Sequence, residues 1–159
     1  MNHEKYLKRC AEIAVESMEG GNNPFGALLV DKDGNILIES GNIEVVEKDI
    51  TGHAETTVAK LAGKKYSKEF LWETTLYSTA EPCCMCTGAI YWANIGKIVY
   101  GISERKLLEL TGSDDKNPTF DIPCRDILAK GQKNIIVLGP LATPEIEQMI
   151  VKPHIGFWG

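Results

Sequence analysis

Two short clusters combine side chains that bind soft metals with one that moves protons. His53-Ala54-Glu55 has an imidazole two positions before a carboxylate, and Pro82-Cys83-Cys84-Met85-Cys86 contains a C-x-x-C pair. One imidazole nitrogen and two thiolates form a ligand set that suits Zn²⁺. We therefore predict that His53, Cys83 and Cys86 bind one zinc ion.

Three protein ligands leave the fourth tetrahedral position of a zinc ion to water, which is typical of a catalytic site. Bound zinc brings the pKa of that water down to about 7, so that hydroxide is available at neutral pH. A carboxylate close to a ligand, as Glu55 is, can move protons. These parts favour hydrolysis at a carbon that accepts hydroxide and loses a protonated group.

The same residues leave two other interpretations open. A fourth protein ligand, from Cys84, Cys124 or His154, would make the zinc site structural. Without a metal, the C-x-x-C pair could instead be a redox pair.

Both clusters need the start of a helix to bring their side chains together. His53 and Glu55 would point to nearly opposite sides in mid-helix, so His53 must lie at the very beginning of its helix. A C-x-x-C pair at a helix start can direct both sulfurs to one ion, and the helix dipole favours the thiolate form. The hydrophobic spacing predicts these two helices over 52–62, ended by Gly63, and over 84–93.

The rest of the chain alternates between short helices and strands separated by Gly and Pro. Further helices are expected over 3–18, 104–110 and 124–129 and after Thr143-Pro144, and strands over 26–30, 35–40, 74–79, 97–102 and 134–138. This order predicts an α/β fold, a three-layer α/β/α sandwich with a mixed five-stranded sheet. Residues 1–159 are expected to form a single domain, in which 143–159 form a C-terminal helix and an active-site lid.

The composition fits a globular protein and excludes a disordered chain, a collagen-like chain and a coiled coil. Hydrophobic residues make up 43% and charged residues 25% of the 159 residues. A net charge of -5 gives no support to a dominant nucleic-acid partner. No apolar run reaches membrane-spanning length, and the first ten residues are too polar for a secretory signal. Five cysteines, three of them within four positions, indicate thiols or metal ligands in a reducing compartment, hence a cytoplasmic protein.

The two clusters match the H-x-E…P-C-x-x-C signature of zinc deaminases. From about Pro24 to Ile102 the chain resembles the cytidine-deaminase-like superfamily, closest to small bacterial guanine and cytosine deaminases and tRNA adenosine deaminases. The segments Pro24-Phe25-Gly26-Ala27 and Thr87-Gly88-Ala89-Ile90-Tyr91-Trp92-Ala93 carry this resemblance further. Neither a structural zinc nor a redox pair accounts for Glu55 and Pro82 at their signature positions.

The resemblance implies a zinc-dependent hydrolytic deaminase in which His53, Cys83 and Cys86 bind Zn²⁺ and Glu55 shuttles protons. Residues expected to contact the substrate are Asn42, Phe25, Ala54, Asp114 and Trp158. Asn42 could instead be only a turn residue after Gly41. The aromatic tail around Trp158 could fold over the pocket, pack on a second subunit or fray.

The resemblance implies a free base or nucleoside as substrate, guanine first and a cytosine-like base next. A tRNA adenosine deaminase is the alternative, which the acidic net charge disfavours. A non-catalytic, zinc-stabilised interaction module is a third hypothesis. The segments after Ile102, FDIPCRDILAKGQKN and HIGFW, depart from the guanine deaminase pattern. Relatives of this size imply a homodimer, and no membrane partner is expected.

Overall fold

A computed structural model of the chain describes residues 2–112, 115 and 117–158. Its helices are α1 (His3–Glu19), α2 (Ala54–Lys65), α3 (Lys68–Trp72), α4 (Cys84–Ala93), α5 (Glu104–Thr111), α6 (Cys124–Leu128) and α7 (Pro144–Val151), followed by a short 3₁₀ helix, η1 (Lys152–His154). Its strands are β1 (Gly26–Val30), β2 (Ile36–Gly41), β3 (Thr75–Ala80), β4 (Lys97–Ile102) and β5 (Ile136–Leu138).

The described strands form one mixed sheet in the order β2-β1-β3-β4-β5. Strand β1 is antiparallel to both β2 and β3, whereas β3-β4 and β4-β5 are parallel pairs. The turn between β1 and β2 begins at Asp31, whose carboxylate accepts hydrogen bonds from the backbone of Asp33 and Asn35, each at 2.9 Å. The predicted five-stranded mixed sheet with one hairpin is confirmed.

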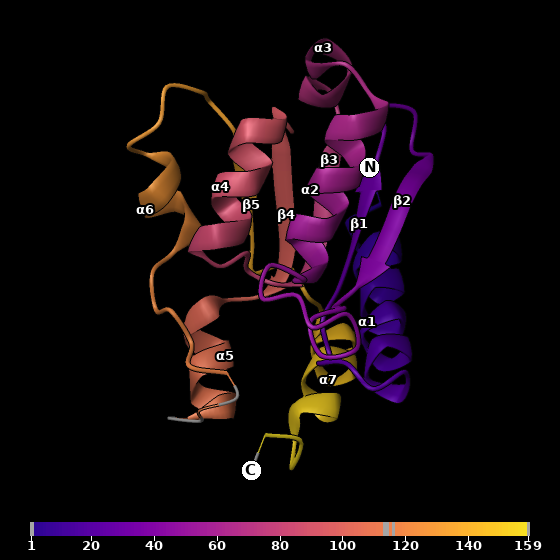
Figure 1. The fold of residues 1–159 in the computed structure, drawn as a ribbon, viewed down its shortest axis with the longest axis vertical. Coiled ribbons are helices and arrows are strands. Elements are labelled where there is room, and N and C mark those ends of the chain that lie inside the picture. The colour runs from indigo at the N-terminus through magenta and orange to yellow at the C-terminus, as the bar shows by residue number, and fades with distance from the viewer. Residues whose placement is uncertain (1, 113–114, 116, 159) are drawn as a thin grey trace.

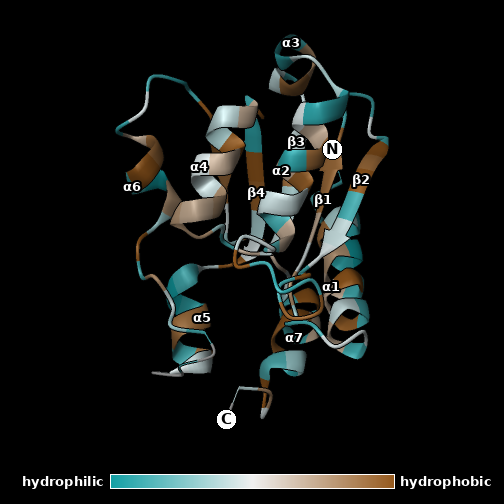
Figure 2. Ribbon diagram, in the orientation of Figure 1, coloured by the Kyte–Doolittle hydropathy of each residue, from teal (hydrophilic) through white to brown (hydrophobic). Residues whose placement is uncertain are grey.

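Helices cover both faces of the sheet and complete the predicted three layers (Figure 1). On β1, Leu28 and Val30 pack into a core with α1 and α7, while Ala27 and Leu29 face the core under α2 and α4. This alternation is the period-two geometry of a strand buried on both faces. Hydrophobic residues accordingly run along β4, one of the inner strands of the sheet (Figure 2). None of the described helices combines the length and apolar character that a membrane span needs.

Several elements differ from the predicted ones. Helix α2 runs past Gly63 to Lys65, because a glycine in an open position weakens a helix without ending it. Helix α3 was not predicted; the Ser67 hydroxyl caps it by accepting a hydrogen bond from the Phe70 backbone. Strand β5 is shorter than the expected 134–138, and β3 begins and ends one residue later than 74–79.

The topology gathers several chain segments at one edge of the sheet. Because β1 runs opposite to its neighbours, its beginning meets the ends of β2, β3 and β4. Helices α2 and α4 also begin at this edge (Figure 1). In open α/β sheets, ligands bind in the crevice outside the carboxyl ends of strands. The fold therefore brings the two clusters of chemistry-bearing residues to the edge where a ligand site is expected.

Candidate active site

The three predicted zinc ligands meet at the beginnings of two helices. His53 is the N-cap of α2, Cys83 is the N-cap of α4, and Cys86 lies in the first turn of α4. The Nδ1 atom of His53 is 3.5 Å from each sulfur, and all three ligand atoms lie within 4.8 Å of one another. Tetrahedral zinc with its usual bond lengths needs an N···S separation of about 3.6 Å. The group therefore fits zinc, and His53 lies at the helix start as predicted.

A structural site would need a fourth protein ligand. Among the described residues the group contains only these three, and Cys84, Cys124 and His154 are not part of it. Cys84 lies in the cavity wall, and Cys124 and His154 are buried elsewhere. The geometry therefore matches a zinc site whose fourth position is open, which is the catalytic type.

The three ligand side chains have very different pKa values in the metal-free protein. The thiol of Cys86 donates to Cys83, which lowers the pKa of Cys83 to about 4 and raises the pKa of Cys86 well above its ordinary value. The contact with Cys83 also raises the pKa of His53 to about 9. The hydroxyl of Thr56 donates to the Cys86 sulfur at 3.1 Å. Without metal, the Cys83 thiolate is thus held between an imidazolium and a thiol.

Glu55 lies in the first turn of α2, directly beside the ligand group. Its side chain lines the cavity, yet the residue is only 6% exposed. Burial raises the pKa of this carboxyl to about 7, with the Cys83 thiolate adding to the shift and His53 opposing it. A carboxyl with a pKa near neutrality can both accept and donate a proton at pH 7.

Glu44, which no sequence motif indicated, lies beside the other ring nitrogen of His53. Its Oε1 atom lies 3.7 Å from Nε2 of His53, the ring nitrogen that faces away from the sulfurs. The same oxygen accepts hydrogen bonds from the side-chain amides of Asn42, at 3.2 Å, and Asn23, at 3.3 Å. A carboxylate near the second nitrogen of a metal-binding histidine orients the ring and raises its basicity.

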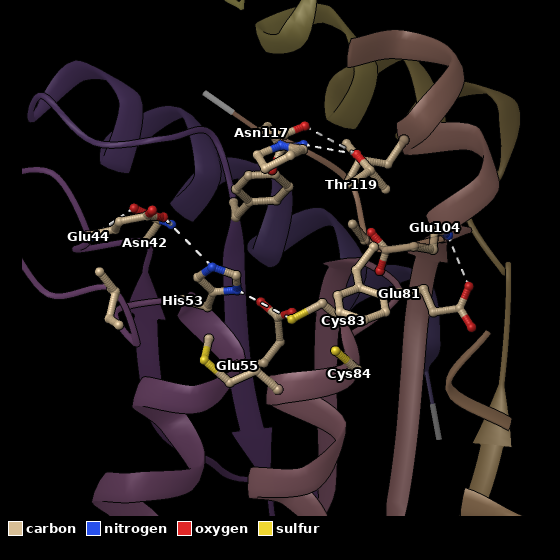
Figure 3. Close-up of a pocket in the computed structure, with 17 residues that line it drawn as sticks. Asn42, Glu44, His53, Glu55, Glu81, Cys83, Cys84, Glu104, Asn117 and Thr119 are labelled. Carbon is tan, nitrogen blue, oxygen red and sulfur yellow. Dashed lines mark hydrogen bonds and ion pairs between the residues drawn. The ribbon is translucent and has the colours of Figure 1, made fainter. Parts of the chain in front are cut away.

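The ligand group opens into a cavity of about 320 Å³, within the size range of small-molecule sites (Figure 3). Its wall combines acidic and amide side chains near the strand ends with apolar side chains around them. The lining residues are Phe25, Asn42, Glu44, Ile50, His53, Glu55, Ala80, Glu81, Cys83, Cys84, Met85, Glu104, Leu107, Asn117, Pro118, Thr119 and Phe120. The cavity therefore offers a small ligand both hydrogen-bonding groups and apolar surface.

The residues expected to touch the substrate are placed differently from one another. Phe25 and Asn42 line the cavity, whereas Ala54 is fully buried and does not line it. Asn42 also forms a turn, since its Oδ1 accepts a hydrogen bond from the Glu44 backbone at 3.0 Å. Both interpretations of Asn42 are thus compatible with the structure. Asp114 lies outside the described residues.

Trp158 lies behind the cavity wall rather than in it. Its indole Nε1 donates to Nδ1 of His154 at 3.0 Å, and both side chains are buried. The His154 ring meets the Phe25 ring edge-on, with centroids 5.2 Å apart. The described part of the tail is packed rather than frayed: the Trp158 ring also lies 6.1 Å from the Phe25 ring, centroid to centroid, and neither Trp158 nor His154 lines the cavity.

Two further acidic residues, Glu81 and Glu104, stand on the β4 side of the cavity. Glu81 accepts hydrogen bonds from the backbone of Glu104, at 2.9 Å, and of Cys124, at 2.8 Å, and so ties the beginnings of α5 and α6 to the end of β3. Glu104 is 4% exposed and lines the cavity. Burial raises the pKa of its carboxyl to about 8, and the negative charges of Cys83, Glu55 and Glu81 add to the shift.

Comparison with known proteins gives a consistent match. Residues 1–102 match the model of the cytidine and deoxycytidylate deaminase zinc-binding region. A probable cytosine deaminase of Schizosaccharomyces pombe is 37% identical over 153 residues, which is 96% of this chain and 90% of that protein. A guanine deaminase of Bacillus subtilis is 41% identical over 116 residues, which is 72% of this chain and 73% of that protein.

Solved structures extend the similarity to the fold. A structure from studies of A-to-I editing by tRNA:A34 deaminases matches with a TM-score of 0.72 and 27% identity, covering 94% of this chain and 98% of that one. The structure of the Bacillus subtilis guanine deaminase matches with a TM-score of 0.64 and 40% identity, covering 73% of each chain. The first match therefore includes the segments after Ile102, where the motifs of the sequence end.

Proposed function

Because the chain belongs to the cytidine and deoxycytidylate deaminase zinc-binding family, it is a zinc-dependent deaminase, and we propose that it releases ammonia from a free nucleobase. The observation that carries the proposal is the buried Glu55 beside a three-ligand metal group at the wall of a cavity of about 320 Å³. Such a cavity suits a single heterocyclic base, and the position beside Glu55 suits proton transfer to it.

Zinc held by His53, Cys83 and Cys86 would supply a Lewis acid that lowers the pKa of water to about 7. Glu55 takes the two protons of the attacking water one after the other and delivers one to the ring nitrogen and one to the leaving amine. The carbon gains a C–O bond and loses its C–N bond, so ammonia leaves and a carbonyl remains. The pKa of Glu55, about 7, supports both directions of transfer at neutral pH.

Each residue expected to contact the substrate has its own proposed role. Asn42 would exchange its hydrogen bond with Glu44 for one to the base, and the Phe25 ring would pack on the base. Ala54, whose side chain is buried, would contribute main-chain atoms only. Trp158 and the rest of 143–159 would act as a support for Phe25, directly and through His154, rather than as a lid that touches the base.

Cytosine is the first base to test and guanine the second. The similarity to the probable cytosine deaminase covers 96% of this chain, whereas that to the guanine deaminase covers 72%. The longer match includes the region after Ile102, which departs from the guanine deaminase pattern. A tRNA substrate calls for many phosphate contacts from Lys and Arg, and a net charge of -5 disfavours it.

An ammonia-release screen of the zinc-loaded protein tests the proposal. The panel contains cytosine, isocytosine, guanine, adenine, their nucleosides and a tRNA anticodon stem-loop, with Glu55→Ala as the control that should keep zinc and lose activity. Turnover of a free base that Glu55→Ala abolishes supports the proposal. Inosine formation in the stem-loop without turnover of any base would replace it with tRNA editing. Stoichiometric zinc with no ammonia from any substrate would favour a non-catalytic zinc module.

Two further properties belong to the proposal. We propose a homodimer that buries the Tyr91-Trp92 face of α4, because the Trp92 side chain is 73% exposed. Light scattering of the protein and of a Trp92→Lys variant tests this, since the variant should shift toward the monomer.

We also propose that the protein works in a reducing compartment such as the cytoplasm, because two zinc ligands are thiolates and every cysteine is free.

A further inference from the structure

Glu104 is a buried acidic residue, and one of its carboxyl oxygens has no hydrogen-bond partner among the described residues. It is the first residue of α5 and lies two positions after β4. The cap of this helix is the Ser103 hydroxyl, which accepts from the Lys106 backbone at 3.0 Å, so the Glu104 carboxyl is not needed there. Within the described part of the chain, its Oε2 atom is buried and has no hydrogen-bond partner.

The basic residues nearest to Glu104 in the chain are engaged elsewhere. Arg105 pairs with Asp121 at 2.9 Å, and Lys106 pairs with Glu147 at 3.8 Å. Among the described ion pairs, none includes Glu104. A buried carboxyl oxygen without a hydrogen-bond partner costs free energy, and a ligand in the cavity that supplies the missing hydrogen bond would remove this cost.

The position of Glu104 relative to Asn42 defines two ends of the cavity. Asn42 follows β2 and Glu104 follows β4, and these strands are three positions apart in the sheet, a distance of about 14 Å. In Figure 3 the Glu104 carboxyl turns toward the cavity, His53 and Glu55 lie between it and Asn42, and the Glu81 carboxyl turns away. A planar base held over Glu55 would therefore present one edge to Asn42 and another to Glu104.

We propose that Glu104 is a specificity-determining residue that accepts a hydrogen bond from a ring N–H of the base, on the edge remote from Asn42. This deepens the proposed function and rests on it. A carboxyl oxygen accepts hydrogen bonds from N–H groups, whether the other oxygen is protonated or not. In a nucleoside the corresponding ring nitrogen of cytosine or guanine carries the sugar instead of a hydrogen. Glu104 therefore selects free bases against nucleosides and against bases methylated at that nitrogen.

Two variants of equal bulk separate hydrogen bonding from packing. Glu104→Gln keeps an acceptor oxygen, whereas Glu104→Leu keeps most of the volume and removes the acceptor. The readout is kcat/KM for cytosine and for 1-methylcytosine, or for guanine and 9-methylguanine if guanine is the better substrate. Zinc content and thermal unfolding are measured for each variant, and Glu109→Leu, on the exposed side of α5, is the matched control.

The wild-type protein should prefer the base with the free N–H by about 2- to 10-fold, the range for a hydrogen bond to a neutral group. Glu104→Leu should lose that preference by losing activity on the unmethylated base alone, while Glu104→Gln and Glu109→Leu keep most of it. Equal losses on both bases would make Glu104 a packing residue and overturn the proposal while the proposed function stands. Absence of any preference in the wild type would also overturn it. No turnover of any base by the wild type would remove the proposed function and this inference with it.

Discussion

His53 stands between two partners, and each of its ring nitrogens faces one of them. Its Nδ1 atom is 3.5 Å from both cysteine sulfurs, and its Nε2 atom is 3.7 Å from the Glu44 carboxylate. Glu44 is itself held by the side-chain amides of Asn23 and Asn42. The Glu44 carboxylate thus orients the His53 ring and also accepts a hydrogen bond from Asn42 in the cavity wall. The metal group and the proposed substrate contact therefore share one residue.

The first prediction concerns this link. Glu44→Gln should lower zinc affinity by about 10- to 100-fold, because the histidine loses the carboxylate that orients it and raises its basicity. Competition against a chelator of known affinity measures the change. Glu47→Gln, an exposed position in the same loop, is the control and should leave zinc affinity unaltered. Equal affinities for the wild type and Glu44→Gln would show that Glu44 does not act through His53.

The second prediction concerns the protons that zinc displaces. At pH 7 the pKa of His53, about 9, and the raised pKa of Cys86 keep both groups protonated in the metal-free protein, whereas Cys83, with a pKa of about 4, is already a thiolate. At pH 5 to 6, below the pKa of zinc-bound water, binding should therefore release about two protons per zinc, and the apparent affinity should rise by about 100-fold per pH unit. Calorimetry at about pH 6 in buffers of different ionisation enthalpy counts the protons. A release of three would mean that Cys83 is a thiol, and a release of none would contradict the whole charge distribution.

The zinc ligands could be predicted from the sequence because their geometry is local. A C-x-x-C pair and an H-x-E triplet each place their side chains through a single helix start, so spacing alone defines which side chains meet. The two motifs meet because α2 and α4 both begin at the same edge of the sheet. The fold class could be predicted for the same reason, since strands and helices alternate clearly along the chain.

Glu44 and Glu104 could not be predicted, because their roles arise from contacts between distant segments. Glu44 lies in a loop without periodicity, nine residues before His53, and no spacing rule connects them. Glu104 reaches the cavity only because β4 ends beside β3. The contacts of Trp158 could not be predicted for the same reason. Its aromatic side chain is typical of a buried position, but its contact with His154, which packs on Phe25, depends on the tertiary structure.

The third prediction is a pH dependence of stability that originates at His154. Burial lowers the pKa of this histidine to about 4, against an ordinary value of about 6.5, so the folded protein keeps it neutral. Its neutral form stabilises the fold fully above pH 6.5, and stability should fall by up to about 3 kcal/mol as the pH drops from 6.5 to 4. Urea unfolding of the wild type and of His154→Gln, compared at each pH, isolates the effect. The difference between the two should change across this window, and a constant difference would exclude His154 as the source.

The fourth prediction compares two glycines with opposite surroundings. At Gly26, which begins β1 next to Phe25, an added Cβ would lie 2.3 Å from the Cys10 carbonyl oxygen and 2.9 Å from the Ala14 nitrogen, both backbone atoms of α1 that cannot move aside. Gly26→Ala should therefore destabilise the protein by about 1–3 kcal/mol through overpacking. At Gly63, inside α2, the same Cβ meets nothing within 4 Å, and Gly63→Ala should stabilise by about 0.5–1 kcal/mol through helix propensity. Chemical unfolding measures both. If Gly26→Ala left stability unchanged or raised it, the close contact between α1 and the start of β1 would not exist in solution.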